Sequence, residues 1–391
     1  MDILLSRRIA STSAYAFAEV DRQVALLRSR GIKVIDFGVG DPREPTPAFV
    51  IDTLARSARQ HAASGYPSYD GSPEFRRACA TYLERDFGVQ LDPDKEIIST
   101  IGSKEAVFHF PLGVIDPGNV VICPSPGYPP YKTGTRFAGG TPYFVPLLPE
   151  NGFLMDFEGI PADIVERARI IWTNYPNSPS GRCAPRGWLR KLYDWSQKND
   201  IIIAADEGCY IDLYFAEKPA SMLEIGRDGV IVFYSLSKRN NMTGYRIGFC
   251  AGDQRLVGAL KRVKTNIDSG VPLFVQEAAS AALEDENQVH QLRTGYRRKM
   301  DVITCALQRI HLPACASEAT FYLWQRAPKG MTGLGLAEKL LEAGIVVTPG
   351  EWLSDETAQG LNPGREYMRF ALVPTLDEIQ EAAERIARLK I

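Results

Sequence analysis

The stretch SLSKRNNMTGYRIGF, residues 235–249, follows an apolar run and contains two serines, a lysine and two arginines close together. A lysine among apolar and aromatic neighbours is suited to forming a Schiff base with an aldehyde. Ser235, Ser237 and Arg246 can bind a phosphate group, the arginine through two parallel hydrogen bonds. The alternative interpretation is a solvated Lys–Arg loop at the end of a strand.

Two further stretches favour a bound cofactor. Asp206 ends the apolar run DIIIAAD (200–206), where a carboxylate needs a cationic partner such as a protonated pyridine nitrogen. In the alternative interpretation, this aspartate only caps a helix or turn. The segment IGSKE (101–105) follows the run EIIST and opens a helical stretch, so its free backbone N–H groups can face an anion. Phosphate, aldehyde and ring nitrogen together describe pyridoxal 5'-phosphate (PLP).

The middle of the chain alternates short apolar runs with helical patterns. Apolar runs without polar alternation are typical of strands buried on both faces, as in a parallel sheet covered by helices. We therefore predict an α/β fold, with a large PLP-binding domain over residues 46–275 and a mostly parallel central sheet. The strand candidates are EIIST (96–100), NVVIC (119–123), ARIIWTN (168–174), DIIIAAD (200–206) and VIVFYSLS (230–237).

The two ends of the chain have a different pattern. Helical stretches over 276–310, 334–344 and 375–390, with the strand candidates ATFYLWQ and EYMRFAL, predict a smaller α+β domain over residues 276–391. The spacing of Phe17, Val20, Val24 and Leu27 predicts an amphipathic helix over 13–30. This helix belongs to an N-terminal arm, residues 1–45, that we expect to pack with the small domain.

Composition excludes several classes of protein. The 391 residues include 45 Lys plus Arg and 47 Asp plus Glu. The net charge of −2 therefore does not predict binding to nucleic acid or to an anionic membrane surface. Seven cysteines without a CxxC pair are typical of a reduced, cytoplasmic protein. The sequence contains no HExxH, GxGxxG or P-loop motif, and we expect no metal site.

Taken together, these motifs resemble the fold-type-I PLP-dependent enzymes of the class I/II aminotransferase family, and more narrowly its diaminopimelate branch. The resemblance extends from about residue 13 to the C-terminus. It rests on DFGVGDP (36–42), GYPSYDGSPEFRRA (65–78), IGSKEA (101–106), PGYPPY (126–131), residues 235–249, TNIDSG (265–270), SEATFYLW (317–324), TPG (348–350) and YMRFALVPT (367–375).

The resemblance implies a role for each matching residue. Lys238 would be the Schiff-base lysine and proton shuttle, Asp206 the partner of the pyridinium nitrogen, and Tyr210 a donor to the phenolic oxygen of the ring. Tyr128 would stack on the ring. The phosphate would be held by Ser103, Lys104, Ser235, Ser237 and Arg246, with Tyr66 reaching the cofactor of a neighbouring subunit.

The substrate would be held by a second set of residues. Arg369 would clamp the α-carboxylate, with the backbone of Gly40 alongside. Tyr15 and Asn266 match substrate-contacting positions, and Lys104 and Tyr128 border the same space. Sharing of sites between subunits implies a homodimer.

Two departures from the family pattern lie near the phenolic oxygen of the cofactor. The family's NPTG motif is Ser178-Pro179-Ser180-Gly181 here, so a serine stands where an asparagine would bond that oxygen. Asn177 takes this role only if the loop shifts. One extra residue, Gly208, separates Asp206 from Tyr210.

The expected activity is transfer of an amino group between an amino acid and a 2-oxo acid by a ping-pong mechanism. The favoured pair is LL-diaminopimelate, or its N-succinyl form, with 2-oxoglutarate, in lysine biosynthesis. The alternatives are a PLP-dependent lyase, cyclase or oxidase on the same fold, and a non-catalytic effector-binding module.

Overall fold

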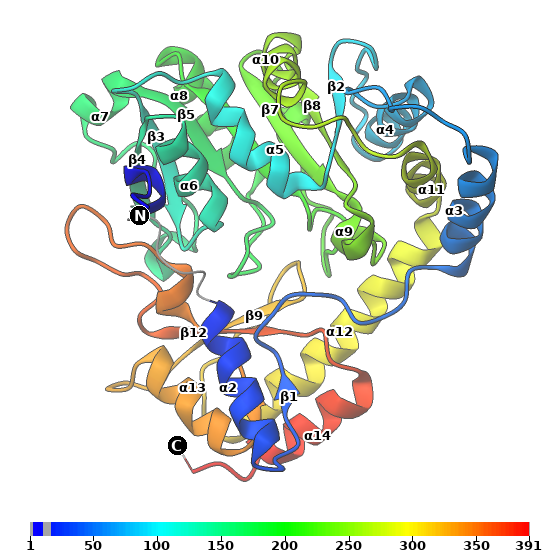
Figure 1. Ribbon diagram of the computed structural model, residues 1–391. Helices are drawn as coiled ribbons and strands as arrows, with labels where there is room; N and C mark the ends of the chain where they lie inside the picture. Colours follow the sequence, from blue (N-terminus) through cyan, green and yellow to red (C-terminus); the bar gives the residue numbers. More distant parts are fainter. Residues whose placement is uncertain (1–2, 11–16, 391) are drawn as a thin grey trace.

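The computed structural model describes residues 3–10 and 17–390, which form a large α/β domain and a smaller domain (Figure 1). Tyr15, expected to contact substrate, lies outside the described residues. Within those residues no helix is long and apolar enough to cross a membrane, and no cluster of side chains could hold a metal ion.

The helices alternate with the strands through the large domain, as the sequence pattern predicts, and further helices lie in the arm and the small domain. They are α1 (Arg7–Ala10), α2 (Phe17–Ser29), α3 (Ala48–Gln60), α4 (Pro73–Phe87), α5 (Ser103–His109), α6 (Pro129–Phe137), α7 (Ala162–Arg167), α8 (Arg186–Lys198), α9 (Leu236–Arg239), α10 (Gln254–Lys264), α11 (Leu273–Glu284), α12 (Glu286–Arg309), α13 (Gly333–Glu342) and α14 (Leu376–Ile386).

The strands form one large sheet and two small ones. They are β1 (Ile35–Asp36), β2 (Ile97–Thr100), β3 (Val120–Ser125), β4 (Thr141–Pro146), β5 (Ala168–Thr173), β6 (Ile202–Gly208), β7 (Val230–Ser235), β8 (Gly248–Gly252), β9 (Tyr322–Arg326), β10 (Ile345–Val346), β11 (Thr348–Pro349) and β12 (Tyr367–Ala371).

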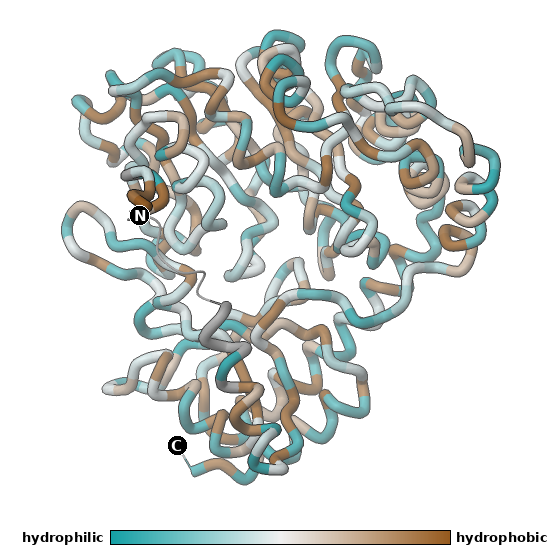
Figure 2. The backbone as a smooth tube through the Cα atoms, in the orientation of Figure 1, coloured by the Kyte–Doolittle hydropathy of each residue, from teal (hydrophilic) through white to brown (hydrophobic). Residues whose placement is uncertain are grey.

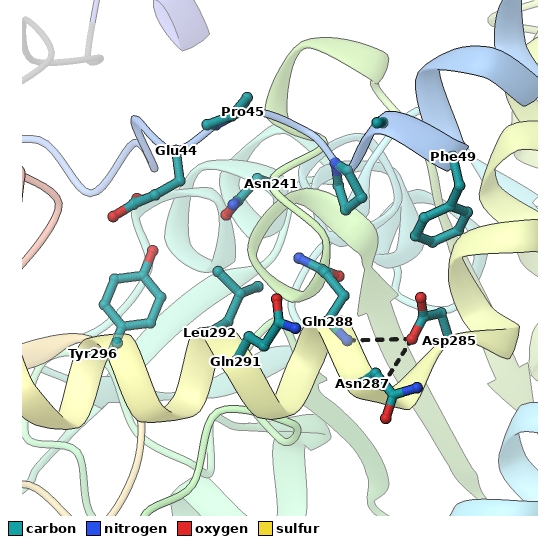
Figure 3. A pocket seen from close by; sticks show the side chains of 13 residues that line it. Glu44, Pro45, Phe49, Asn241, Asp285, Asn287, Gln288, Gln291, Leu292 and Tyr296 are labelled. Carbon is teal, nitrogen blue, oxygen red and sulfur yellow. Dashed lines mark hydrogen bonds between the residues drawn. The ribbon is translucent and has the colours of Figure 1, made fainter.

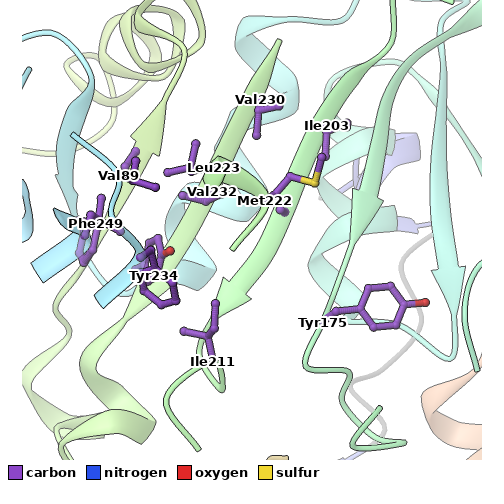
Figure 4. Close-up of a cluster of buried hydrophobic side chains, with 14 of the residues drawn as sticks. Val89, Tyr175, Ile203, Ile211, Met222, Leu223, Val230, Val232, Tyr234 and Phe249 are labelled. Carbon is purple, nitrogen blue, oxygen red and sulfur yellow. The ribbon is translucent and has the colours of Figure 1, made fainter. Parts of the chain in front are cut away.

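The large sheet has seven strands in the described part of the chain, in the order β2-β8-β7-β6-β5-β3-β4. Every pairing is parallel except those of β8, which runs antiparallel to β2 and β7. Both faces are buried, and Figure 4 shows one cluster of the apolar side chains that cover it. The predicted mostly parallel α/β fold is confirmed.

The sequence pattern misses two strands of this sheet. β4 contains Pro142 and Pro146, and it lies at the sheet edge, where a strand tolerates proline because one side of its backbone pairs with no other strand. β8 begins and ends with glycine, and a Cβ at Gly248 would lie 2.3 Å from the carbonyl oxygen of Tyr234. Its glycines therefore allow the strands to pair closely. Because they stand where other strands have apolar side chains, the sequence of β8 lacks the continuous apolar run that identifies those strands.

The small domain packs its helices against the antiparallel sheet β11-β12-β9. The arm joins it through β1, which pairs in parallel with β10, and through Val24 and Leu27 of α2, which pack on Val346. α14 begins with the capping box that the sequence predicts, in which Thr375 and Glu378 bond each other's backbone N–H groups.

The boundary between the domains differs from the expected residue 276. Helix α11 contributes Val275, Ala278 and Leu283 to the apolar core of the large domain, where it packs against α3 and α4. The crossing point is α12, which runs from the large domain into the small one (Figure 1). Helical periodicity could not separate α11 from α12, because it shows which face of a helix is apolar but not which domain covers that face.

The hydropathy of the residues follows their position in the fold. Figure 2 shows hydrophobic residues on the strands and on the inward sides of the helices, with hydrophilic residues around the rim. The N-terminal residues Ile3, Leu4 and Leu5 are an exception, because they are hydrophobic and exposed.

A bulge in β6 accounts for the extra residue between Asp206 and Tyr210. Ala205 pairs with Val232 whereas Gly208 pairs with Tyr234, so the register shifts by one residue between them. A Cβ at Gly208 would lie 2.1 Å from Cδ1 of Tyr234, whose ring stacks on Phe249. The bulge therefore depends on glycine at this position.

We expect Gly208→Ala to lower the free energy of unfolding by about 1–3 kcal/mol, because the added methyl group clashes with a ring that cannot move away. Chemical denaturation of both proteins measures the difference. Gly187→Ala is the matched control: Gly187 lies in α8 with no atom within 4 Å of the added Cβ. Equal destabilisation by both substitutions would contradict the argument.

Candidate active site

A cavity of about 540 Å³ lies between the ends of β6 and β7 and the small domain. It collects residues from the arm, the large domain and the small domain, which lie far apart in the sequence. The lining residues predicted from the sequence are Gly40, Ser103, Lys104, Tyr128, Ser178, Asp206, Tyr210, Ser235, Ser237, Lys238, Arg246 and Arg369.

Lys238 is placed by the short helix α9, which follows β7 directly. Ser235 caps this helix, because its hydroxyl accepts a hydrogen bond from the Ser237 backbone N–H at 3.2 Å. The Lys238 Nζ donates to the carbonyl oxygen of Gly40 at 2.5 Å. The arm therefore positions the amine in the cavity.

Asp206 is 4% exposed at the end of β6. Its Oδ2 accepts a hydrogen bond from the Tyr131 hydroxyl at 2.6 Å, while its buried Oδ1 has no partner among the described residues. Burial raises the pKa of this carboxyl to about 6. A buried carboxylate oxygen without a partner fits a cationic group in the cavity, and a protonated ring nitrogen supplies one.

The anion-binding side of the cavity is formed by Ser103, Ser235, Ser237 and Arg246. The Ser235 hydroxyl lies 3.0 Å from the Ser237 hydroxyl, and Arg246 Nη1 donates to the Thr243 carbonyl at 2.9 Å. A Cβ at Gly102 would lie 2.4 Å from Nη2 of Arg246, so glycine leaves room for the guanidinium. These donors fit a phosphate group.

Arg369 enters from β12 of the small domain. Its Nη2 donates to the Gly38 carbonyl at 2.9 Å, and its guanidinium lies 4.5 Å from the ring centroid of Tyr322. The Tyr322 hydroxyl is 3.0 Å from that of Tyr210, and a Cβ at Gly40 would lie 2.0 Å from it. Glycine at position 40 is therefore needed for the arm to pass this tyrosine.

Sequence reasoning did not assign a role to Tyr322, Tyr131 or Asn174. Tyr322 lies inside the SEATFYLW motif, which identifies the stretch but not the residue that faces the cavity. Tyr131 stacks on Trp172 at 4.7 Å and bonds Asp206, while Asn174 Nδ2 donates to the Asp206 carbonyl at 2.6 Å. These contacts join α6 and the segment after β5 to β6, which are separate in the sequence, so only the tertiary structure shows them.

The loop after β5 places its two candidates differently. Ser178 lines the cavity, and its N–H donates to Asn174 Oδ1 at 2.8 Å. Asn177 does not line the cavity, because it turns inward and its Oδ1 accepts from both the N–H and the hydroxyl of Ser180. The loop therefore presents the serine to the cavity.

Two other candidates lie outside this cavity in the single chain. Tyr66 is 91% exposed. Asn266 borders a surface groove beside α10, where its Nδ2 donates to the Arg262 carbonyl at 2.7 Å.

A mostly parallel sheet ends here at a half-buried amine, a set of anion-binding donors and a buried carboxylate, which is the arrangement of a fold-type-I PLP-dependent transferase. A model of the family described as aminotransferase class I and II matches residues 32–386. The chain belongs to this family, whose members depend on PLP and act on amino acids and 2-oxo acids.

Relatives agree with this assignment over the full length. The chain is 43% identical to an LL-diaminopimelate aminotransferase of Aquifex aeolicus, with 99% of each chain covered. Among solved structures, it resembles a probable N-succinyldiaminopimelate aminotransferase from Thermus thermophilus (TM-score 0.88, 29% identity, 95% and 99% covered). It also resembles the aspartate aminotransferase of that organism with maleate (TM-score 0.89, 28% identity, 99% and 100% covered).

The raised pKa of Asp206 predicts how pH changes the stability of the cofactor-free protein. Because the folded pKa, about 6, lies above the ordinary value of 3.8, the folded state holds the proton more tightly than the unfolded state. Stability from this group is therefore lost as pH rises from about 4 to about 6. We expect Asp206→Asn to gain up to about 3 kcal/mol relative to the wild type across this window.

Denaturation of both cofactor-free proteins at pH 4.5 and pH 8 measures this gain. Glu207, whose pKa burial raises to about 7, is present in both proteins, so its contribution cancels in the comparison. A stability difference that is the same at both pH values would show that Asp206 is not strained by burial.

Proposed function

We propose that this protein is an LL-diaminopimelate aminotransferase that passes the amino group to 2-oxoglutarate as a homodimer. The observation that carries this proposal is the meeting of Lys238, Asp206 and Arg369 in one cavity. Its seven unpaired cysteines favour a reducing compartment, and we propose the cytoplasm.

PLP, when bound, supplies an aldehyde for the substrate amine and a ring that draws electrons from the substrate Cα. Asp206 holds a proton on the ring nitrogen, since its Oδ1 needs a cationic partner. Ser103, Ser235, Ser237 and Arg246, which line the same cavity, would hold the phosphate.

The other residues of the cavity act on the substrate. Arg369 binds the α-carboxylate and thereby directs the Cα hydrogen towards Lys238. The Lys238 Nζ would take the proton from the substrate Cα and hold it for later return, which is general acid–base catalysis by a positioned amine. In the cofactor-free chain, the Gly40 carbonyl accepts a hydrogen bond from this amine and holds it in the cavity.

The substrate class is supported by the charges on the cavity wall. Asp41 and Lys104 both line it, in addition to Arg369. Side chains of both signs suit a substrate whose far end carries an ammonium and a carboxylate, as LL-diaminopimelate does. N-succinyl-diaminopimelate carries no ammonium at that end.

Initial-rate assays with 2-oxoglutarate and each of three donors test the proposal: LL-diaminopimelate, its N-succinyl derivative and L-aspartate. We expect the highest kcat/KM for the first donor, with one glutamate formed per donor consumed. Lys238→Ala should lose more than about 10⁴-fold in kcat, since the substitution removes both the Schiff-base amine and the base for the Cα proton. Donor consumption without glutamate would instead indicate a lyase, cyclase or oxidase.

Arg369→Lys should raise KM for the donor by about 10–100-fold while the affinity for PLP changes little, because an ammonium cannot form two parallel bonds to a carboxylate. Steady-state kinetics and a PLP titration of the cofactor-free protein separate the two effects. Loss of PLP affinity with unchanged donor KM would place this arginine at the cofactor instead.

The homodimer is supported by exposed residues that no described part of the chain covers. Tyr66 and Tyr69 project from a loop that lies beside residues 268–270, since a Cβ at Gly270 would lie 2.6 Å from the Ser68 carbonyl. Ile267 is exposed in the same region. A partner that covers this surface would receive Tyr66 and Asn266 at its own active site.

Co-expression of Lys238→Ala with Tyr66→Ala chains tests whether the sites are shared. If Tyr66 serves the partner, each mixed dimer contains one intact site, so activity returns although both variants alone are impaired. Light scattering should show two chains per particle. Absence of recovery in a verified mixed dimer would place Tyr66 outside the site.

A further inference from the structure

A second cavity, of about 520 Å³, lies between residues 44–49 and the N-terminal half of α12 (Figure 3). It shares no lining residue with the active-site cavity. Because its walls come from the crossing between the domains, we call it the hinge cavity.

One end of the hinge cavity holds three buried oxygen atoms without a hydrogen-bond partner in the described part of the chain. They are Glu44 Oε2, Asn241 Oδ1 and the Tyr296 hydroxyl. Tyr296 is 2% exposed and Asn241 is 8% exposed, and Figure 3 shows the three side chains at the same end. Buried oxygens that lack partners call for a ligand that donates hydrogen bonds.

The oxygens at this end can accept hydrogen bonds from an ammonium group. Glu44 is paired with Lys299 through its other oxygen, Oε1, which leaves Oε2 for a second donor. Lys299 Nζ also lies 5.3 Å from the centroid of the Tyr296 ring. Burial raises the pKa of the Tyr296 hydroxyl above its ordinary range, and the negative charges of Glu44 and Asp41 raise it further. Tyr296 therefore stays protonated, and its oxygen remains able to accept a hydrogen bond.

The rest of the hinge cavity suits an aliphatic chain that ends in a second cation. Pro45, Pro47, Phe49 and Leu292 supply apolar walls, and Asp285 lies at the opposite end from Glu44. The Oδ1 of Asp285 caps α12 by accepting from the Asn287 and Gln288 N–H groups at 2.7 and 3.2 Å. This contact holds the Asp285 carboxylate at that end of the hinge cavity.

We propose that the hinge cavity binds a linear aliphatic diammonium compound. One ammonium donates to Glu44, Asn241 and Tyr296, the chain lies between the apolar walls, and the second ammonium faces Asp285. Asn241 follows closely after Lys238, and Tyr296 belongs to the helix that enters the small domain. The bound compound thus contacts both sides of the domain crossing.

Calorimetric titration of the PLP-loaded enzyme with 1,5-diaminopentane tests this proposal. We expect one saturable site per chain and no change in the absorption spectrum of the cofactor, because the two cavities are separate. The matched ligand 1,5-pentanediol has the same chain without charge, and it should bind at least about tenfold more weakly. Absence of saturable binding, or binding only with a spectral change, would overturn the proposal.

Variants locate the site independently. Tyr296→Phe removes one hydroxyl, and Asn241→Gly removes the amide while tolerating the left-handed backbone (φ 52°) of this position. Each should weaken 1,5-diaminopentane binding about tenfold. Tyr193→Phe, on α8, is the matched control and should bind as the wild type does. Equal affinity in all four proteins would overturn the assignment to the hinge cavity.

Discussion

Asp206 carries an ionisable carboxylate at the end of a strand that is buried on both faces, with one oxygen bonded to Tyr131 and the other without a partner. Burial of such a group opposes folding unless a cation neutralises it. The strands beside it determine what reaches that oxygen, because Asn174 at the end of β5 holds its backbone and Lys238 follows β7. The rest of the site is arranged around a ligand that supplies the missing charge.

Two local departures from the family pattern lie on one side of that ligand. The bulge at Gly208 inserts a residue without moving Tyr210 out of the cavity, because Gly208 lets the strand fold closely over Tyr234. Ser178 lines the cavity where the family has an asparagine, while Asn177 is occupied by Ser180. Tyr210 also lines the cavity, and its hydroxyl lies 3.0 Å from that of Tyr322.

The arm links the active-site cavity to the hinge cavity. Its residues 38–40 receive hydrogen bonds from Arg369 and Lys238, and a few residues later Glu44 pairs with Lys299 of α12. A shift of the small domain about α12 would therefore move both the carboxylate-binding arginine and one wall of the hinge cavity.

The α/β class and the strands with continuous apolar runs follow from the sequence alone, which also predicts roles for Lys238, Asp206, Arg246 and Arg369. Those features are local, since an apolar run or a lysine after a strand can be recognised without knowing what packs on it. The edge strand β4 and the glycine-rich β8 were hidden, because their composition reflects their position in the sheet.

Which side chains contact one another depends on the tertiary structure. The contact of Tyr322 with Arg369 and Tyr210, the inward turn of Asn177 and the placement of α11 in the large domain each depend on elements distant in the sequence. The unpartnered oxygens of Glu44, Asn241 and Tyr296 come from three separate segments. Neither periodicity nor a motif predicts such contacts, because the direction of a side chain is fixed only when the segments pack against one another.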